Sequence, residues 1–348
     1  MRIFNISQAL KRLKGERVKG LNFFASLPLY LFTLLPLYLL SSCSEEIDIQ
    51  LRSGDVRLVV EGGIGIDTTV HTVILSTTIP YFSTDIVPPY VSGAHVTITE
   101  FDSNEQQIRV IPLTEHPTKK GHYQTAPDID GKQRHTYRLD IILNENIGGQ
   151  THYIAEAYFP PIADRIDSIR AVWGQNILFL LLTGMEPNPN SIRTGWNIEV
   201  FAKDPPGDNF YLLVVYKNGV PLNDTLTRLL LLDNQMISQN NIELEGLPMA
   251  FVSDSSWMAV KQGDIIELEI RGVSEEYYRY IHEFGNVYGG TNPMFGGAPA
   301  NVRGNVKSAN GNAIAIGYFW AHGNRRASDV ADRSKKPTFE FDDWRWPR

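Results

Sequence analysis

The clearest secondary-structure signal in this chain is the stretch Tyr137-Arg138-Leu139-Asp140-Ile141-Ile142, in which apolar and polar side chains alternate. Successive side chains of a β-strand point to opposite faces of the sheet, so alternation with a period of two residues predicts a half-buried strand. We expect Tyr137, Leu139 and Ile141 to face a core, and Arg138 and Asp140 to face water. This stretch therefore predicts a sheet with one buried and one solvated face.

Similar segments lie on both sides of this strand, and Gly and Asx turn signals separate them. Five further predicted strands, alternating or rich in β-branched residues, cover residues 57–60, 69–77, 95–101, 107–112 and 151–159. Short strands at this spacing are typical of a β-sandwich. We therefore predict a mostly β fold that begins with an N-terminal, Ig-like β-sandwich domain over residues 57–160.

Pro160-Pro161 ends this first series, because proline has no backbone N–H to donate to a strand ladder. We place a domain boundary at residues 160–166 and expect a second β-rich domain over residues 166–348. Its predicted strands cover residues 168–173, 196–202, 209–217, 265–270 and 313–321. Asn218-Gly219 predicts a hairpin turn, whereas residues 226–232 fit a helix or a strand equally well.

One helix is predicted near residues 275–285. Ser274 is a suitable N-cap, and two acidic residues occupy the first turn. Five apolar or aromatic residues then follow at helical spacing, namely Tyr277, Tyr278, Tyr280, Ile281 and Phe284. Gly285 is expected to end the helix.

The N-terminus has the pattern of an export signal. Five Lys and Arg residues between positions 11 and 19 precede an uncharged apolar segment at 21–40, and Ser41-Ser42 come directly before Cys43. This order predicts a secretory signal peptide over residues 1–42. Cys43, the only cysteine of the chain, resembles the lipidated cysteine of a bacterial lipobox. The alternative is an uncleaved membrane anchor, because about 20 apolar residues can span a bilayer.

The net charge of the exported chain limits the kinds of partner that it can bind. The leader holds six of the 32 basic residues and one of the 39 acidic residues, so the chain from Cys43 onward has a net charge of −12. Such a surface disfavours nucleic acid and anionic lipid, since both are polyanions. We expect acyl chains on Cys43 to anchor the protein in the membrane. The acidic segment at 43–56 is either a tether that directs surface export or simply a solvated linker, and Ser44 is typical of outer-membrane sorting.

The sequence has no recognisable catalytic, cofactor or metal motif. A Gly-x-Ser-x-Gly elbow, a His-Glu-x-x-His pair and a phosphate loop are all lacking, and the eight histidines have no defensible ligand spacing. Asp128-Ile129-Asp130-Gly131 resembles the start of a calcium loop without its later ligands, so a turn is favoured. Asp204 and Asp208 flank a Pro-Pro-Gly loop, which is a poor frame for an acid–base pair. We therefore predict a protein that is not an enzyme.

Aromatic residues are the candidate ligand contacts. Tyr278, Tyr288 and Phe295 could stack on a sugar or a peptide, although the helix tyrosines could instead pack the helix onto its sheet. The long Gly-, Pro- and Asn-rich segments at 183–194 and 289–301 are where we expect binding. Trp344 and Trp346 fit a docking tail or a terminal strand.

Several short motifs, taken in their order along the chain, are similar to one known family. They are Leu58-Val59-Val60-Glu61-Gly62, Val91-Ser92-Gly93-Ala94-His95-Val96, Ile166-Asp167-Ser168-Ile169, Asn292-Pro293, Gly304-Asn305 and Gly317-Tyr318-Phe319. Together with the lipobox and acidic tether, they resemble the Bacteroidetes DUF4249 lipoproteins over nearly the whole exported chain. The resemblance implies a lipoprotein anchored in the outer membrane and facing the cell exterior. It also implies an accessory binding role beside a TonB-dependent transporter. The alternative is a structural or adhesive protein of the envelope or fimbriae.

Overall fold

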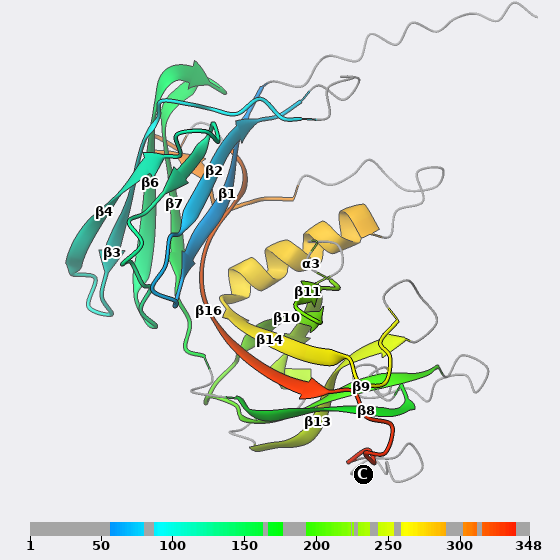
Figure 1. The fold of residues 1–348 in the computed structure, drawn as a ribbon. Coiled ribbons are helices and arrows are strands. Elements are labelled where there is room, and N and C mark those ends of the chain that lie inside the picture. The colour runs from blue at the N-terminus through cyan, green and yellow to red at the C-terminus, as the bar shows by residue number, and fades with distance from the viewer. Residues whose placement is uncertain are drawn as a thin grey trace, which may run out of the picture. The chain divides into compact units, whose positions relative to one another are not determined.

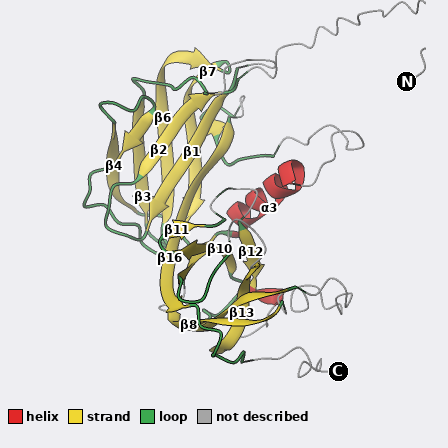
Figure 2. Ribbon diagram, turned by 45° about the vertical axis from the view of Figure 1, so that its right-hand side comes forward, coloured by secondary structure: helices red, strands yellow, loops and turns green. Residues whose placement is uncertain are grey.

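The computed structural model describes residues 56–79, 87–162, 166–176, 193–223, 225, 229–236, 243–253, 259–289, 302–311 and 315–338. Several predictions fall outside these residues: the signal peptide, Cys43 and nearly all of the tether, Phe295, Trp344 and Trp346. Most of the two predicted binding segments, at 183–194 and 289–301, also lies outside them. Strands make up most of the described chain, which confirms the mostly β fold class (Figure 2).

The first group of strands encloses one hydrophobic core. Its members are β1 (Leu58–Gly65), β2 (Thr72–Thr77), β3 (His95–Phe101), β4 (Gln107–Glu115), β5 (His122–Gln124), β6 (Thr136–Ile147) and β7 (Gln150–Tyr158). They are hydrogen-bonded in the order β1-β2-β5-β4-β3-β6-β7. Strand β5, which sequence patterning did not predict, is short and joins β2 to β4.

Strand β6 contains the stretch with which the prediction began. Tyr137, Leu139 and Ile141 are fully buried at 0 % exposure, while Arg138 and Asp140 on the opposite face are half-buried. Leu139 lies opposite Ile98 of β3, and Ile141 lies opposite Val96. The predicted facing of this strand is confirmed.

The second group of strands forms two layers around another core. A three-stranded sheet has the order β13-β9-β8, formed by β13 (Glu243–Ser253), β9 (Thr194–Lys203) and β8 (Ile166–Gln175). The other layer contains β10 (Phe210–Lys217), β11 (Val220–Pro221), β12 (Leu230–Asp233) and β14 (Ile265–Val273), with the short helix η3 (Asn234–Met236) after β12. Trp196 and Ile198 of β9 share this core with Leu213 of β10 and Leu268 of β14.

One turn, one ambiguous stretch and one missed strand illustrate the local rules. Asn218 and Gly219 have φ values of 50° and 78° and join β10 to β11, which confirms the predicted hairpin. Of the ambiguous stretch at 226–232, residues 230–232 belong to strand β12. Strand β13 escaped prediction because Gly246 and Pro248 interrupt its alternation, and β-bulges occur at both places.

The helix α3 (Glu275–Gly289) covers the opposite face of the β10–β14 layer (Figure 1). Ser274 caps it through its hydroxyl oxygen, which accepts a hydrogen bond from the Tyr277 N–H at 3.3 Å. The prediction that Gly285 ends the helix is wrong, since the helix continues to Gly289. Glycine lowers helix propensity by only about 1 kcal/mol, and Phe284 packs against Tyr280 with ring centroids 6.3 Å apart.

A single long strand joins the two groups. β16 (Ile316–Val330) pairs in parallel with β1 over residues 316–322 and antiparallel with β14 over residues 323–330 (Figure 1). Sequence patterning predicted only its first part, at 313–321. Strand β15 (Lys307–Ser308), which precedes β16 in the chain, pairs antiparallel with β7. Residues 53–348 form one compact unit, and the division into domains at 57–160 and 166–348 stays a prediction.

A buried ion network fixes the second half of β16. The Glu269 carboxylate on β14 is 2 % exposed and accepts hydrogen bonds from Arg271 Nε and Tyr216 OH, each at 2.7 Å. Arg326 of β16 lies directly opposite Glu269, with its Nη2 atom 2.5 Å from the carboxylate. These contacts lower the pKa of Glu269 in spite of its burial. They tie β10, β14 and β16 together in one register.

His322 lies where β16 changes partners. Its ring stacks on Trp320 with centroids 4.1 Å apart, and its Nδ1 atom has no hydrogen-bond partner among the described residues. The pKa of His322 is lowered to about 3, chiefly by burial and also by the nearby Arg271 and His71, against an opposing effect of Glu269. The ring is therefore neutral at every moderately acidic pH in the folded protein.

Acidification should destabilise the protein through His322. In the unfolded chain the ring takes up a proton near pH 6.5, whereas the folded protein resists protonation until the pH is about 3. The contribution of His322 to the free energy of unfolding is therefore complete above pH 6.5. It falls with decreasing pH, by about 2 kcal/mol between pH 7 and pH 5. Urea unfolding of His322→Phe should show a shallower pH dependence than the wild type. His95→Gln, at an exposed strand position, is the control. An unchanged pH dependence in His322→Phe would contradict the assignment.

Candidate functional site

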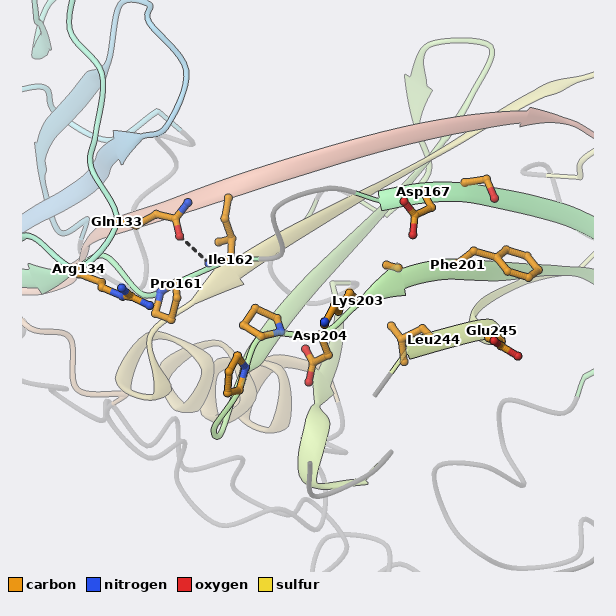
Figure 3. Close-up of a pocket in the computed structure, with 14 residues that line it drawn as sticks. Gln133, Arg134, Pro161, Ile162, Asp167, Phe201, Lys203, Asp204, Leu244 and Glu245 are labelled. Carbon is orange, nitrogen blue, oxygen red and sulfur yellow. Dashed lines mark hydrogen bonds between the residues drawn. The ribbon is translucent and has the colours of Figure 1, made fainter. Parts of the chain in front are cut away.

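A pocket of about 740 Å³ lies at the end of the β13-β9-β8 sheet where β8 begins and β9 ends (Figure 3). Five segments of the chain line it: the segment before β6, the segment after β7, the beginnings of strands β8 and β13, and the end of β9 with the loop that follows it. The lining residues are Gln133, Arg134, Pro161, Ile162, Asp167, Ser168, Phe201, Ala202, Lys203, Asp204, Pro205, Pro206, Leu244 and Glu245. Its volume falls in the range of small-molecule sites, about 300–1,000 Å³.

Proline pairs form two of its walls. Pro160-Pro161 follows β7, and the Ile162 N–H after it donates to the Gln133 side-chain oxygen at 3.0 Å (Figure 3). Pro205-Pro206 follows β9. Proline removes an N–H donor and fixes its own φ, so these segments end their strands and give stiff, apolar surfaces.

Asp204 holds the second proline wall in place. Its carboxylate is 9 % exposed and accepts hydrogen bonds from the Tyr211 hydroxyl and from Asn234 Nδ2, the latter at 2.7 Å. Asn234 Nδ2 also donates to the Gly207 carbonyl at 2.8 Å, and Asn209 Nδ2 donates to the Pro205 carbonyl at 2.7 Å. Burial raises the pKa of Tyr211, and the adjacent Asp204 raises it further. The Asp204 carboxylate is therefore a structural acceptor that keeps the loop rigid.

Exposed charges and one aromatic ring face the remaining space. Arg134, Lys203 and Glu245 are exposed, and Phe201 is half-buried. On the sheet, Phe201 lies between Ser168 of β8 and Glu245 of β13. Within the described part of the chain, no ion pair joins these three charged side chains to any partner. They are free to contact a ligand.

The aromatic ligand candidates predicted from the sequence lie away from the pocket or outside the described atoms. Tyr278 is half-buried on α3 and packs against Phe210 with ring centroids 5.2 Å apart, away from the pocket lining. The backbone of Tyr288 belongs to α3, its side chain is outside the described atoms, and Phe295 is outside the described residues. A ligand role for these three stays a prediction. Tyr277 and Tyr280 are buried against Tyr318, at centroid distances of 4.8 and 4.9 Å, as the packing alternative expects.

Other polar candidates are engaged within the fold. The described residues contain no group of three His, Cys, Asp or Glu side chains placed to hold a metal ion. His135 Nδ1 lies 2.7 Å from Oε1 of the buried Glu100 carboxylate, and Asp130 pairs with Lys132. Asp128 lies in a turn before β6, as the turn interpretation predicted. No described helix is long and apolar enough to cross a membrane.

A comparison with protein families assigns the chain to a family. The model of the family DUF4249, described as a domain of unknown function, matches residues 44–328. The chain belongs to the DUF4249 family. Every residue that lines the pocket falls inside the matched range. A search of curated proteins finds no match.

Sequence reasoning did not identify the pocket of this DUF4249 protein, although it singled out both proline pairs as strand ends. Arg134, Phe201, Lys203 and Glu245 come from three separate segments. Only the pairing of β13 with β9 brings Glu245 beside Phe201. The signal in the sequence that could have indicated a pocket was the two Pro-Pro pairs after strands, because stiff segments at strand ends can form rigid pocket walls.

Asp204→Ala should destabilise the protein much more than Asp208→Ala, although both carboxylates flank the same loop. Asp204 is buried and its removal leaves the Tyr211 hydroxyl and one N–H of the Asn234 amide without an acceptor, whereas Asp208 is exposed. We expect a loss of about 1–3 kcal/mol for Asp204→Ala and less than about 0.5 kcal/mol for Asp208→Ala. Chemical denaturation measures both. Equal effects would show that Asp204 does not hold the loop.

Proposed function

We propose that this DUF4249 protein is a lipid-anchored protein of the outer membrane that faces the cell exterior and binds a ligand. In this proposal it is an accessory subunit of a TonB-dependent nutrient-uptake system. The observation that carries the binding role is the pocket of about 740 Å³ with stiff walls and exposed charges. The leader that ends at Cys43 and the acidic tether support the location.

We propose binding without catalysis. General acid–base chemistry needs a carboxylate or histidine whose proton is available to a substrate. Among the carboxylates that line the pocket, Asp204 is already engaged by the Tyr211 hydroxyl and Asn234, and Asp167 and Glu245 are exposed rather than enclosed. The exposed Arg134 and Lys203 are cationic hydrogen-bond donors, which suit recognition of a charged ligand.

A structural or adhesive role is the second candidate, and one surface feature favours it. Ile108 and Val110 on β4 and Ile142 on β6 are 53 %, 52 % and 48 % exposed. Ile108 and Val110 lie on the same face of β4, and exposed apolar side chains on a sheet face are typical of contact surfaces. Recovery of the protein in purified fimbriae or extracellular matrix would favour this role.

Lipidation at Cys43 is directly testable. In cells labelled with radioactive palmitate, we expect the wild type to carry label and to sediment with the outer membrane. Cys43→Ala should carry no label and should leave the membrane fraction, because the thiol is the only one in the chain. Ser44→Ala keeps the thiol and should stay labelled. Label or membrane retention in Cys43→Ala would contradict the lipid anchor.

The transporter association predicts a partner. Affinity purification of the lipidated protein from detergent-solubilised outer membranes should recover a TonB-dependent transporter, identified by mass spectrometry. Deletion of this protein's gene should lower uptake of the nutrients that the transporter imports. Recovery of no transporter, together with unchanged growth on those nutrients, would refute the accessory role.

A further inference from the structure

We infer that the pocket takes a short peptide with free termini, laid across the outer face of the β13-β9-β8 sheet. This inference rests on the proposed ligand-binding function and specifies its ligand class. Three observations carry it: a segment of this chain already bound to the same face, the continuity of that face with the pocket, and the charges within the pocket.

The chain itself shows how this face binds a peptide segment. Residues 332–338, here called the strap, cross the outer face of the sheet after β16. The Lys336 carbonyl accepts from Arg170 Nη2 at 2.8 Å, and the Thr338 N–H donates to Glu199 Oε1 at 2.7 Å. The Thr338 hydroxyl donates to the other oxygen of Glu199 at 2.8 Å. The sheet face therefore recognises main-chain N–H and C=O groups, which every peptide carries.

The strap and the pocket occupy successive positions on one strand. Trp196, Ile198 and Val200 of β9 face the inner core, so Glu199, Phe201 and Lys203 point to the outer face. Glu199 is covered by Thr338 and is 0 % exposed, whereas Phe201 and Lys203 line the pocket. A side chain at Gly246 of β13 would overlap Thr338. One residue earlier, Glu245 opens into the pocket. The pocket thus continues the surface that the strap covers.

The chemistry of the pocket matches both ends of a peptide. Lys203 and Arg134 supply cationic donors for a carboxylate, and Glu245 supplies an acceptor for an ammonium group. Hydrogen bonds between charged partners are the stronger ones, and capture of free termini is a known mode of peptide recognition. Phe201 and the walls of Pro161 and Pro205 offer apolar contact for side chains. A neutral sugar would use neither the cations nor the acid as charged partners.

The test uses two probe mixtures and the exported chain from residue 44 onward, without lipid. The first mixture contains peptides of four to six residues from a tryptic digest of casein, and the second contains maltooligosaccharides of similar size. Native mass spectrometry identifies bound species, and calorimetry on a bound peptide gives its Kd. The same peptide is also made with an acetylated N-terminus or an amidated C-terminus.

Two pocket variants have matched controls outside the pocket. Lys203→Gln should weaken binding of the free peptide about tenfold, and it should have no further effect on the amidated peptide. Glu245→Gln should weaken the free peptide similarly and should not affect the acetylated one. Lys261→Gln and Glu283→Gln, which change exposed residues elsewhere, should bind as the wild type does. All four variants should melt at the wild-type temperature, because the altered side chains are exposed.

The outcomes separate this inference from the proposed function. If the acetylated and amidated peptides bind as tightly as the peptide with free termini, the inference is overturned. If maltooligosaccharides bind and peptides do not, the inference is also overturned. If Lys203→Gln weakens that sugar binding, the pocket remains a ligand site. If neither mixture binds and the Lys203→Gln strain takes up nutrients normally, both the inference and the ligand-binding function fail.

Discussion

The fold depends on the pairing of β16 with two different strands. Its first half continues β1 in parallel, and its second half continues β14 antiparallel. The first half requires glycine where it approaches β1, since Gly317 has a φ of 95° and a side chain there would overlap the Val60 carbonyl. The Glu269–Arg326 contact then fixes the second half, because a buried carboxylate is costly unless it is paired. The same strand contributes Phe319 to one core and packs Ala327 against the other.

The candidate site follows from how strands of both groups end. Proline pairs terminate β7 and β9, and Asp204 anchors the second of these segments through Tyr211 and Asn234. The side chains left exposed between them are charged or aromatic, and they sit on a sheet face that the strap partly covers. A rigid rim and a face suited to main-chain recognition together give a binding surface. The location and partner proposed for the protein depend instead on the segment around Cys43.

Local patterns predicted the local structure well. The alternation at Tyr137, Leu139 and Ile141 predicted both a strand and its buried face, because side-chain period and burial are linked directly. Asn218-Gly219 predicted its hairpin because both residues tolerate positive φ. Prediction failed where tertiary contacts override propensity. Helix α3 passes Gly285 while Phe284 packs on Tyr280, and β13 forms in spite of Gly246 and Pro248 because β9 supplies a partner strand.

The sequence by itself determined the mostly β class, the positions of most of the long strands, the helix cap and membership of a family, since each depends on residues close together in the chain or on their order. Only the tertiary structure decided the pocket. Glu245 and Phe201 are neighbours because β13 pairs with β9, and Thr338 reaches Glu199 because the chain returns across the sheet after β16. Hydrophobic periodicity specifies which face of a strand is buried, but it carries no information about which strands become neighbours. The binding surface arises from that choice of neighbours.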